Sequence, residues 1–358
     1  MARVYNFSAG PAVMPLEALQ EAQADLVDYK GSGMSIMEMS HRGKEYDAVH
    51  NEAIANIKEL MGLGDEYAVL FLQGGASLQF AMLPMNFLGE GQTADYVNAG
   101  SWGSAAVKQA RLIGNVNIAA DCQKDIPTRM PDADEMKWTP GAAYSHITTN
   151  ETISGAQFKS IPETGSPLVG DMSSDILSRP IDYSKFAMIY AGAQKNLGPS
   201  GVALVVIRKE FAEKGSISLP TMFRYQTHIE NNSLYNTPPC FSIYMLCLTT
   251  RWLKKIGLQN IFTINRNKAQ LIYDAIDASG FYRGTAKKAF RSDMNVTFRL
   301  PTEELETLFI KQASEAGMKQ LKGHRSVGGI RASIYNAFPV AGVKALVDFM
   351  KDFEKRNG

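Results

Sequence analysis

Short apolar runs alternate with amphipathic stretches between residues 67 and 208. The runs occupy residues 67–72, 94–98, 115–119, 143–148, 167–169, 186–190 and 202–208. Each run has the length of a strand, and helical periodicity at 78–87 and 103–113 fills two of the intervals. Apolar strands that alternate with helices are typical of βαβ units, in which helices cover both faces of a mostly parallel sheet. The pattern therefore predicts an α/β fold whose main sheet is mostly parallel.

Two helices are predicted ahead of the first strand. Residues 15–30 form an amphipathic pattern that begins with Pro15, and glycines at 31 and 33 follow it. Residues 44–61 form a second pattern, which Gly62 follows. Proline at the first helical position and glycine after the last one are common helix boundaries. We therefore expect both segments to be helical over these ranges.

The order of elements changes after about residue 255. Two helices, at 241–256 and 258–278, lead into a strand at 294–300, a helix at 302–316, a strand at 329–335 and a final helix at 340–354. This order predicts a second, smaller α/β domain. We expect a large domain over residues 15–255 and a small domain formed by residues 1–14 and 256–358.

Composition and charge exclude several classes of protein. The 358 residues include 37 Lys and Arg against 36 Asp and Glu, so the net charge is +1 and binding of a polyanion is not the expected function. The three cysteines show no C-x-x-C spacing, which predicts neither a disulfide framework nor a metal site. Residues 1–19 lack a signal-peptide core, and no apolar run approaches membrane-spanning length. We therefore expect a soluble protein of the cytoplasm.

Several common enzyme motifs are absent from the sequence. No G-x-G-x-x-G follows a predicted strand, and there is no P-loop, H-E-x-x-H or G-x-S-x-G. The missing glycine fingerprint disfavours a dinucleotide oxidoreductase, and nucleotide-triphosphate, zinc-protease and serine-hydrolase functions also lack their usual support. An open α/β sheet nevertheless binds its ligand outside the carboxyl ends of its strands. The residues that follow the predicted strands are therefore the candidates for a site.

Three of these strand ends carry suggestive residues. The segment 73–77, Gln-Gly-Gly-Ala-Ser, joins a strand to a helix and offers unpaired amide groups to an anion, although a simple turn capped by Ser77 explains it equally well. Asp171 follows the run 167–169. Lys195 follows the run 186–190 and is the only charged residue between 186 and 207. Burial would make its amine a nucleophile, whereas a lysine that reaches solvent remains the alternative.

Together these groups match the needs of pyridoxal phosphate. A lysine forms the covalent bond to the cofactor aldehyde, an aspartate stabilises the protonated ring nitrogen, and a helix start holds the phosphate. Trp102 stands at another predicted strand-to-helix turn and could stack on the ring, although a packed core aromatic is the alternative. The sequence therefore predicts a pyridoxal-phosphate site and no metal.

The chain resembles the phosphoserine aminotransferase family, whose members are fold-type-I, pyridoxal-phosphate-dependent enzymes of class V. The matching segments are FSAGPA (7–12), SHRGKEY (40–46), QGGAS (73–77), GSWG (100–103), NETISG (150–155), YAGAQKNLGPSG (190–201), YNTPP (235–239) and GHRSVGGIRASIYNA (323–337). The resemblance covers essentially the whole chain and implies a large cofactor-binding domain with a smaller C-terminal domain. It implies reversible amino transfer between glutamate and 3-phosphohydroxypyruvate, and in some bacteria a parallel reaction in pyridoxine synthesis.

The resemblance also implies a role for each matching residue. The catalytic residues are Lys195, Asp171 and Trp102; the cofactor-binding residues are Ala76, Ser77, Trp102, Thr152, Asp171, Gln194 and Lys195, with Asn236 and Thr237 supplied by the partner subunit; the substrate-binding residues are Ala9, His41, Arg42, His324 and Arg331. His41 and Arg42 are also expected to come across the subunit boundary. The implied active unit is therefore a homodimer with two composite sites.

Two positions depart from some family members, and two other functions stay open. Ser77 stands where some bacterial members carry Arg, and Ala9 replaces a Ser found in others. Arg331 alternates with Ile330 and Ala332 and so points away from the apolar face of its strand, which solvent exposure would also explain.

The alternative functions are a class-V aminotransferase for another keto acid, such as glyoxylate or pyruvate, and a non-catalytic cofactor-binding protein.

Overall fold

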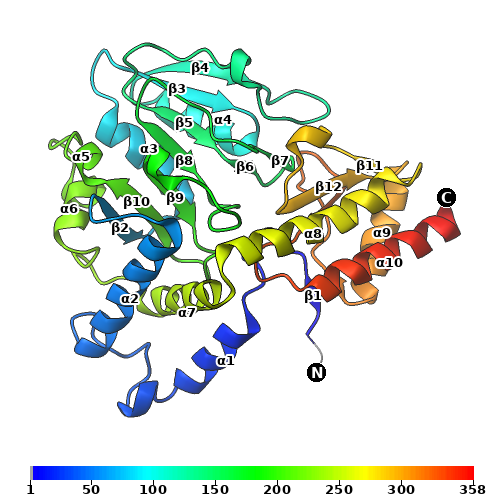
Figure 1. Ribbon diagram of the computed structural model, residues 1–358, viewed down its shortest axis with the longest axis horizontal. Helices are drawn as coiled ribbons and strands as arrows, with labels where there is room; N and C mark the ends of the chain where they lie inside the picture. Colours follow the sequence, from blue (N-terminus) through cyan, green and yellow to red (C-terminus); the bar gives the residue numbers. More distant parts are fainter. Residues whose placement is uncertain (1–2) are drawn as a thin grey trace.

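A seven-stranded sheet forms the centre of the larger part of the protein in this computed structural model, which describes residues 3–358 (Figure 1). Its strands, in spatial order, are β2 (Tyr67–Leu72), β10 (Ala203–Arg208), β9 (Phe186–Gly192), β8 (Leu168–Asp171), β5 (Ser145–Thr148), β3 (Thr93–Asn98) and β4 (Asn115–Asp121). Strands β9, β8, β5, β3 and β4 pair in parallel, whereas β10 is antiparallel to both of its neighbours. This arrangement confirms the predicted α/β class with a mostly parallel sheet.

Helices cover both faces of this sheet, because its strands are apolar on both sides. In β2, Val69 and Phe71 face one hydrophobic core, while Leu70 and Leu72 face another. The helices α1 (Leu16–Asp25), α2 (Lys44–Met61) and α7 (Cys240–Ile256) pack on the first side, and α3 (Gly75–Phe87) and α4 (Ser101–Ala110) on the second. Burial of both faces explains why the strands appear in the sequence as continuous apolar runs.

The C-terminal part builds a separate core around a three-stranded sheet. The sheet orders β11 (Arg283–Gly284), β12 (Asn295–Arg299) and β14 (Ile330–Ser333), and the helices α8 (Leu258–Asp277), α9 (Glu303–Glu315) and α10 (Val340–Asn357) pack against it. The N-terminal strand β1 (Tyr5–Asn6) joins this part by pairing in parallel with β13 (Met318–Lys319). Phe7, Phe298, Phe309 and Phe353 are fully buried in its core. Figure 1 shows these elements together at one side of the molecule.

The helix expected over residues 15–30 is shorter than predicted. It ends at Asp25, and a separate 3-10 turn occupies Tyr29–Gly31 with Lys30 at a positive φ of 51°. Tyr29 is buried edge-to-face against Tyr244, with ring centroids 5.8 Å apart. The chain leaves the helix to place this ring, while Val27 stays exposed. A tertiary contact therefore overrides the continuous helical pattern.

The remaining elements are short and were not predicted. They are the hairpin β6 (Asn150–Glu151) and β7 (Ala156–Gln157), the helices α5 (Lys209–Ala212) and α6 (Tyr225–Glu230), and 3-10 turns at Ala133–Glu135, Tyr183–Lys185, Thr221–Phe223 and Lys288–Phe290. Among the described helices, none is both long enough and apolar enough to cross a bilayer. Residues 1 and 2, part of the predicted small domain, lie outside the described residues.

Candidate functional site

A cavity of about 280 Å³ lies where the parallel strands end, between the two parts of the chain. Ten of the predicted site residues line it: Ala9, Ala76, Ser77, Trp102, Thr152, Asp171, Gln194, Lys195, His324 and Arg331. They come from positions as far apart in the sequence as residues 9 and 331. The fold therefore brings together groups that no local motif connects.

Lys195 lies in the turn that follows β9, and its amine faces the cavity. Its Nζ donates a hydrogen bond of 2.7 Å to Oγ1 of Thr152 and lies 5.5 Å from the centre of the Trp102 ring. Desolvation lowers the pKa of Lys195 to about 8, although the carboxylates of Asp171 and Glu151 act in the opposite direction. A substantial fraction of this amine is therefore neutral near pH 8, as a nucleophile must be.

Asp171 ends strand β8 and is buried beside the lysine. Its Oδ1 accepts hydrogen bonds from the Ser173 amide (2.9 Å) and the Ser173 hydroxyl (2.6 Å). Burial raises the pKa of Asp171, whereas these bonds and the charge of Lys195 lower it. Within the described part of the chain no donor is bonded to Oδ2, so this oxygen is available to a ligand. Ser173 is a supporting residue to which the sequence pattern assigned no role.

The start of helix α3 lines another side of the cavity and offers backbone amides to an anion. Gly74 and Gly75 have φ angles of 83° and 63°, which allow the chain to turn sharply from β2 into the helix. A side chain at Gly75 would meet no atom within 4 Å, so the space beside it is open. No side chain caps the helix, which excludes Ser77 as the cap and leaves the amides at Ala76 and Ser77 free for a phosphate.

Trp102 lies in the first turn of α4 and forms the aromatic wall of the cavity. Its ring is tilted toward Phe80 with centroids 6.5 Å apart, and its buried indole Nε1 has no hydrogen-bond partner. The Glu151 carboxylate accepts the backbone N–H of Trp102 at 3.1 Å. The indole is therefore placed by a backbone contact as well as by packing.

Arg331 and His324 come to the cavity from the C-terminal part. Arg331 lies on β14 between the buried residues Ile330 and Ala332, so strand alternation points its side chain to the cavity, where desolvation lowers its pKa. His324 precedes this strand, and its Nδ1 is 2.7 Å from the Ser326 hydroxyl. Desolvation and the charges of Arg331 and Arg325 lower the pKa of His324. Arg331 therefore supplies the positive charge on this wall of the cavity, and His324 adds an imidazole whose neutral form is favoured.

Four predicted site residues do not line this cavity. His41 and Arg42 lie just before helix α2, and Arg42 is exposed. Asn236 donates a hydrogen bond of 2.9 Å to the Gln73 side chain, and Thr237 is exposed. The resemblance assigned all four to the cavity of a partner subunit. Their roles stay predictions.

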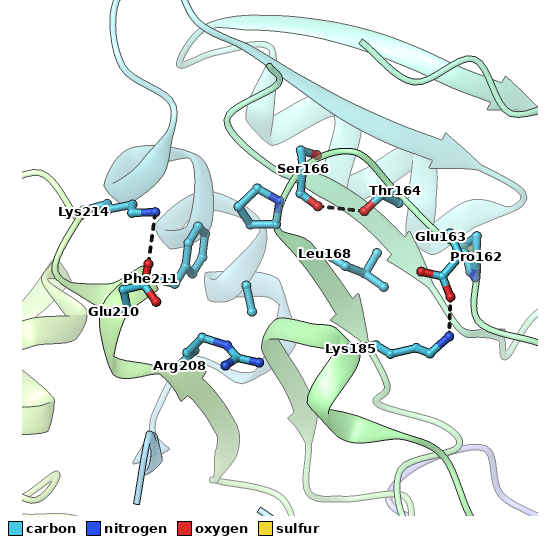
Figure 2. A pocket seen from close by; sticks show the side chains of 12 residues that line it. Pro162, Glu163, Thr164, Ser166, Leu168, Lys185, Arg208, Glu210, Phe211 and Lys214 are labelled. Atoms are coloured by element: carbon cyan, nitrogen blue, oxygen red, sulfur yellow. Dashed lines mark hydrogen bonds and ion pairs between the residues drawn. The ribbon is translucent and has the colours of Figure 1, made fainter. Parts of the chain in front are cut away.

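A second cavity, of about 290 Å³, lies beside the amino ends of β8 and β9 (Figure 2). Its charges are largely satisfied locally, because Lys185 pairs with Glu163 and Lys214 lies 3.9 Å from Glu210. It contains no predicted site residue. The cavity at the carboxyl ends of the strands is therefore the candidate site.

The residues around the candidate site fit pyridoxal phosphate. An amine of lowered pKa, a carboxylate with a free oxygen, an open helix start and an aromatic wall surround one cavity. Further polar residues that had no predicted role also line it, namely Thr148, Asn150, Ser173 and Ser174, and the buried Thr148 hydroxyl has no partner. Within residues 3–358, no cluster of His, Cys, Asp and Glu side chains could hold a metal ion.

Comparison with known proteins identifies the family of the chain. The family model described as aminotransferase class-V matches residues 4–346. The phosphoserine aminotransferase of Niallia circulans is 57% identical over 359 residues, and that of Desulfosudis oleivorans is 53% identical over 360 residues; each alignment covers 99% of both chains.

Solved structures give the same result. A phosphoserine aminotransferase from Bacillus circulans subsp. alkalophilus superimposes with a TM-score of 0.96 at 56% identity, covering 99% of both chains. A pyridoxal-phosphate-bound phosphoserine aminotransferase from Trichomonas vaginalis has a TM-score of 0.94 at 39% identity, covering 98% of this chain and 100% of the other. By its fold and its similarity over nearly the full length, the chain belongs to the class-V aminotransferases and, within them, to the phosphoserine aminotransferase family.

Proposed function

We propose that this protein transfers an amino group reversibly between glutamate and 3-phosphohydroxypyruvate, giving 2-oxoglutarate and O-phospho-L-serine, with pyridoxal phosphate as cofactor. The observation that carries the proposal is the convergence of Lys195 and Asp171 with Arg331 and His324 around one cavity. The first pair suits the cofactor and the second pair suits a small dianionic substrate. Serine biosynthesis is the process that this reaction serves.

The cofactor-binding roles follow from the chemistry of the walls. Lys195 would hold the cofactor covalently, Asp171 would accept a hydrogen bond from its ring nitrogen, and Trp102 would pack against its ring. Thr152 would hold the ring oxygen, and Ala76, Ser77 and Gln194 would hold the phosphate. When bound, pyridoxal phosphate supplies an electron sink that stabilises negative charge at the substrate Cα.

The Lys195 amine also moves the proton of the reaction. With substrate bound, its Nζ would accept the proton of the substrate Cα and later return one. Its pKa near 8 suits both steps, because general catalysis is most effective when the pKa lies close to the working pH. Its attachment to the same cavity makes the transfer effectively intramolecular.

Arg331 and His324 bind the anionic ends of the substrates. A guanidinium presents two parallel N–H donors to a carboxylate, and the imidazole adds one N–H donor even when neutral. Among the described residues no carboxylate pairs with Arg331, which lines the cavity, so its charge is available to a ligand. Ala9 borders the same space, and its carbonyl is fixed by the Tyr335 hydroxyl at 2.8 Å.

We propose a homodimer as the active unit, with Asn236 and Thr237 completing the phosphate site of the partner and His41 and Arg42 contributing to its substrate site. All four residues lie outside the cavity of their own chain, which supports this assignment. We also propose a cytoplasmic location and a division into a large domain, 15–255, and a small domain formed by 1–14 and 256–358. Separate hydrophobic cores in the two parts support the division.

The test is a half-reaction followed by a choice of keto acids. Glutamate alone should convert the cofactor spectrum to that of its aminated form with release of 2-oxoglutarate. Added 3-phosphohydroxypyruvate should restore the spectrum and yield phosphoserine. Faster restoration by glyoxylate or pyruvate would reassign the substrate, and no spectral change with glutamate would indicate a non-catalytic binding protein. The keto acid of 4-phosphohydroxythreonine, included in the panel, tests for the reaction of pyridoxine synthesis.

A further inference from the structure

We infer that Glu151 is a positioning residue: its carboxylate anchors the first turn of helix α4 and thereby fixes the Trp102 indole over the cofactor cavity. The inference rests on the proposed function only in taking pyridoxal phosphate as the ligand of this cavity. Glu151 does not line the cavity itself. It acts through the backbone of the residue that does.

Two hydrogen bonds connect the carboxylate to the helix. Oε2 of Glu151 accepts the Trp102 amide at 3.1 Å, and Oε1 accepts the Gly103 amide at 2.9 Å. The N-cap residue of α4 is Gly100, which has no side chain that could cap the helix. The first amides of a helix need an acceptor, and a carboxylate there also interacts favourably with the helix dipole. Glu151, from a hairpin distant in sequence, thus replaces a local cap.

The close approach of this carboxylate depends on two glycines. A Cβ at Gly100 would lie 2.4 Å from Cδ of Glu151, so no side chain fits there. A Cβ at Gly103 would lie 3.0 Å from the Val97 carbonyl and 3.4 Å from Oε1 of Glu151. The carboxylate therefore occupies a closed slot against the helix start. The two hydrogen bonds connect the position of this carboxylate to the backbone at Trp102 and Gly103.

Thr152, the residue after Glu151, contacts the catalytic lysine. Thr152 accepts the hydrogen bond from Nζ of Lys195 at 2.7 Å, directly after Glu151 in the chain. Consecutive residues thus hold the aromatic wall and the amine, whose separation is 5.5 Å from Nζ to the ring centre. The hairpin β6–β7 sets the distance between the two groups that would contact the cofactor ring.

Glu151 is buried, so its carboxylate depends on the two amide donors. Its side chain is fully buried. Burial raises the pKa of Glu151 to about 7, even though the hydrogen bonds from the two amides act in the opposite direction. A buried carboxylate without these donors is unfavourable. Glutamine has the same shape but only one acceptor oxygen, so its amide nitrogen would face one N–H group without bonding to it.

Glu151→Gln tests the inference, with Asp95→Asn as the matched control. Asp95 is also fully buried and also accepts a backbone N–H, that of Thr139 at 2.7 Å, but it is the third residue of β3 and does not contact the start of α4. Equilibrium binding of pyridoxal phosphate to the apoprotein is measured without substrate, together with the visible circular dichroism of the bound cofactor. We expect Glu151→Gln to weaken binding about tenfold and to change the dichroism, and Asp95→Asn to change neither.

A double-mutant cycle with Trp102→Ala separates positioning from general stability. If Glu151 acts through the indole, Glu151→Gln should weaken cofactor binding much less in the Trp102→Ala background than in the native one. Equal losses in both backgrounds, or an unchanged dichroism in a folded Glu151→Gln protein, would overturn the inference. Because no substrate is added, these outcomes do not depend on which keto acid the protein uses.

Discussion

Lys195 and Thr152 are joined by a hydrogen bond of 2.7 Å from Nζ to Oγ1, although 43 positions separate them in the chain. No carboxylate lies within 4.0 Å of this amine among the described residues, so a neutral hydroxyl, not a counterion, is its direct partner. A hydroxyl can accept from the amine without strongly favouring its charged form. The contact therefore orients Lys195 while leaving its pKa low.

Replacing Thr152 by Val should remove this orientation at almost constant volume. We expect kcat for amino transfer to fall about tenfold, because one hydrogen bond to a reacting group is lost, while the protein stays folded. Steady-state kinetics with both substrates would measure the effect. Thr152→Ser keeps the hydroxyl and should retain most of the activity; an equal loss in Ser and Val variants would show that the methyl packing, not the hydrogen bond, matters.

Lys195→Ala should abolish amino transfer, because it removes both the covalent attachment and the group that moves the proton. We expect a loss of at least about 10³-fold in kcat, together with loss of the yellow chromophore that borohydride reduces. Thermal unfolding checks that the variant is folded. Steady-state turnover close to the native value would exclude Lys195 as the catalytic amine.

The rate at which the apoprotein captures pyridoxal phosphate should depend on pH through Lys195. Desolvation lowers its pKa from 10.5 to about 8, so the neutral, nucleophilic amine increases as pH rises toward 8 and is the main form above it. The capture rate should therefore increase about tenfold per pH unit well below 8 and level off above it. Stopped-flow absorbance measures this profile.

Asp171→Asn provides a control on the direction of that profile. The negative charge of Asp171 raises the pKa of Lys195, so its removal should move the midpoint of the profile to lower pH. A midpoint that stays near the ordinary lysine value in the native protein would contradict the desolvation argument. A midpoint that rises in Asp171→Asn would contradict the assigned direction of the charge effect.

The sequence predicted residues at the ends of buried apolar strands better than those in short hairpins. Asp171 and Lys195 are recognisable because each follows a buried strand, and buried parallel strands are continuous apolar runs. Glu151 and Ser173 support the same site but had no such signal. Glu151 lies in a two-residue strand, and its contact with α4 exists only in the folded protein.

The sequence pattern also could not predict what a side chain faces when its neighbours come from distant parts of the chain. Alternation correctly placed Arg331 opposite Ile330 and Ala332, but it could not distinguish a cavity from solvent. The helix expected over 15–30 failed for a related reason, because the burial of Tyr29 against Tyr244 is a contact between distant segments. Local periodicity reports which face is apolar, whereas the neighbours of that face come from the fold.

Arg331→Lys should weaken the use of both substrates while keeping the positive charge. Lysine cannot present two parallel donors to a carboxylate, so we expect kcat/KM to fall about 100-fold for glutamate and for 3-phosphohydroxypyruvate, equivalent to about 3 kcal/mol. Lys322→Ala is the matched control, because Lys322 is an exposed cation close to β14 in the chain that does not line the cavity. It should change either value less than about twofold, as expected for a screened surface charge. Steady-state kinetics at fixed ionic strength measure all four values. An Arg331→Lys enzyme with unchanged kcat/KM for both substrates would remove Arg331 from the binding site, and a loss confined to one substrate would restrict its role to that substrate.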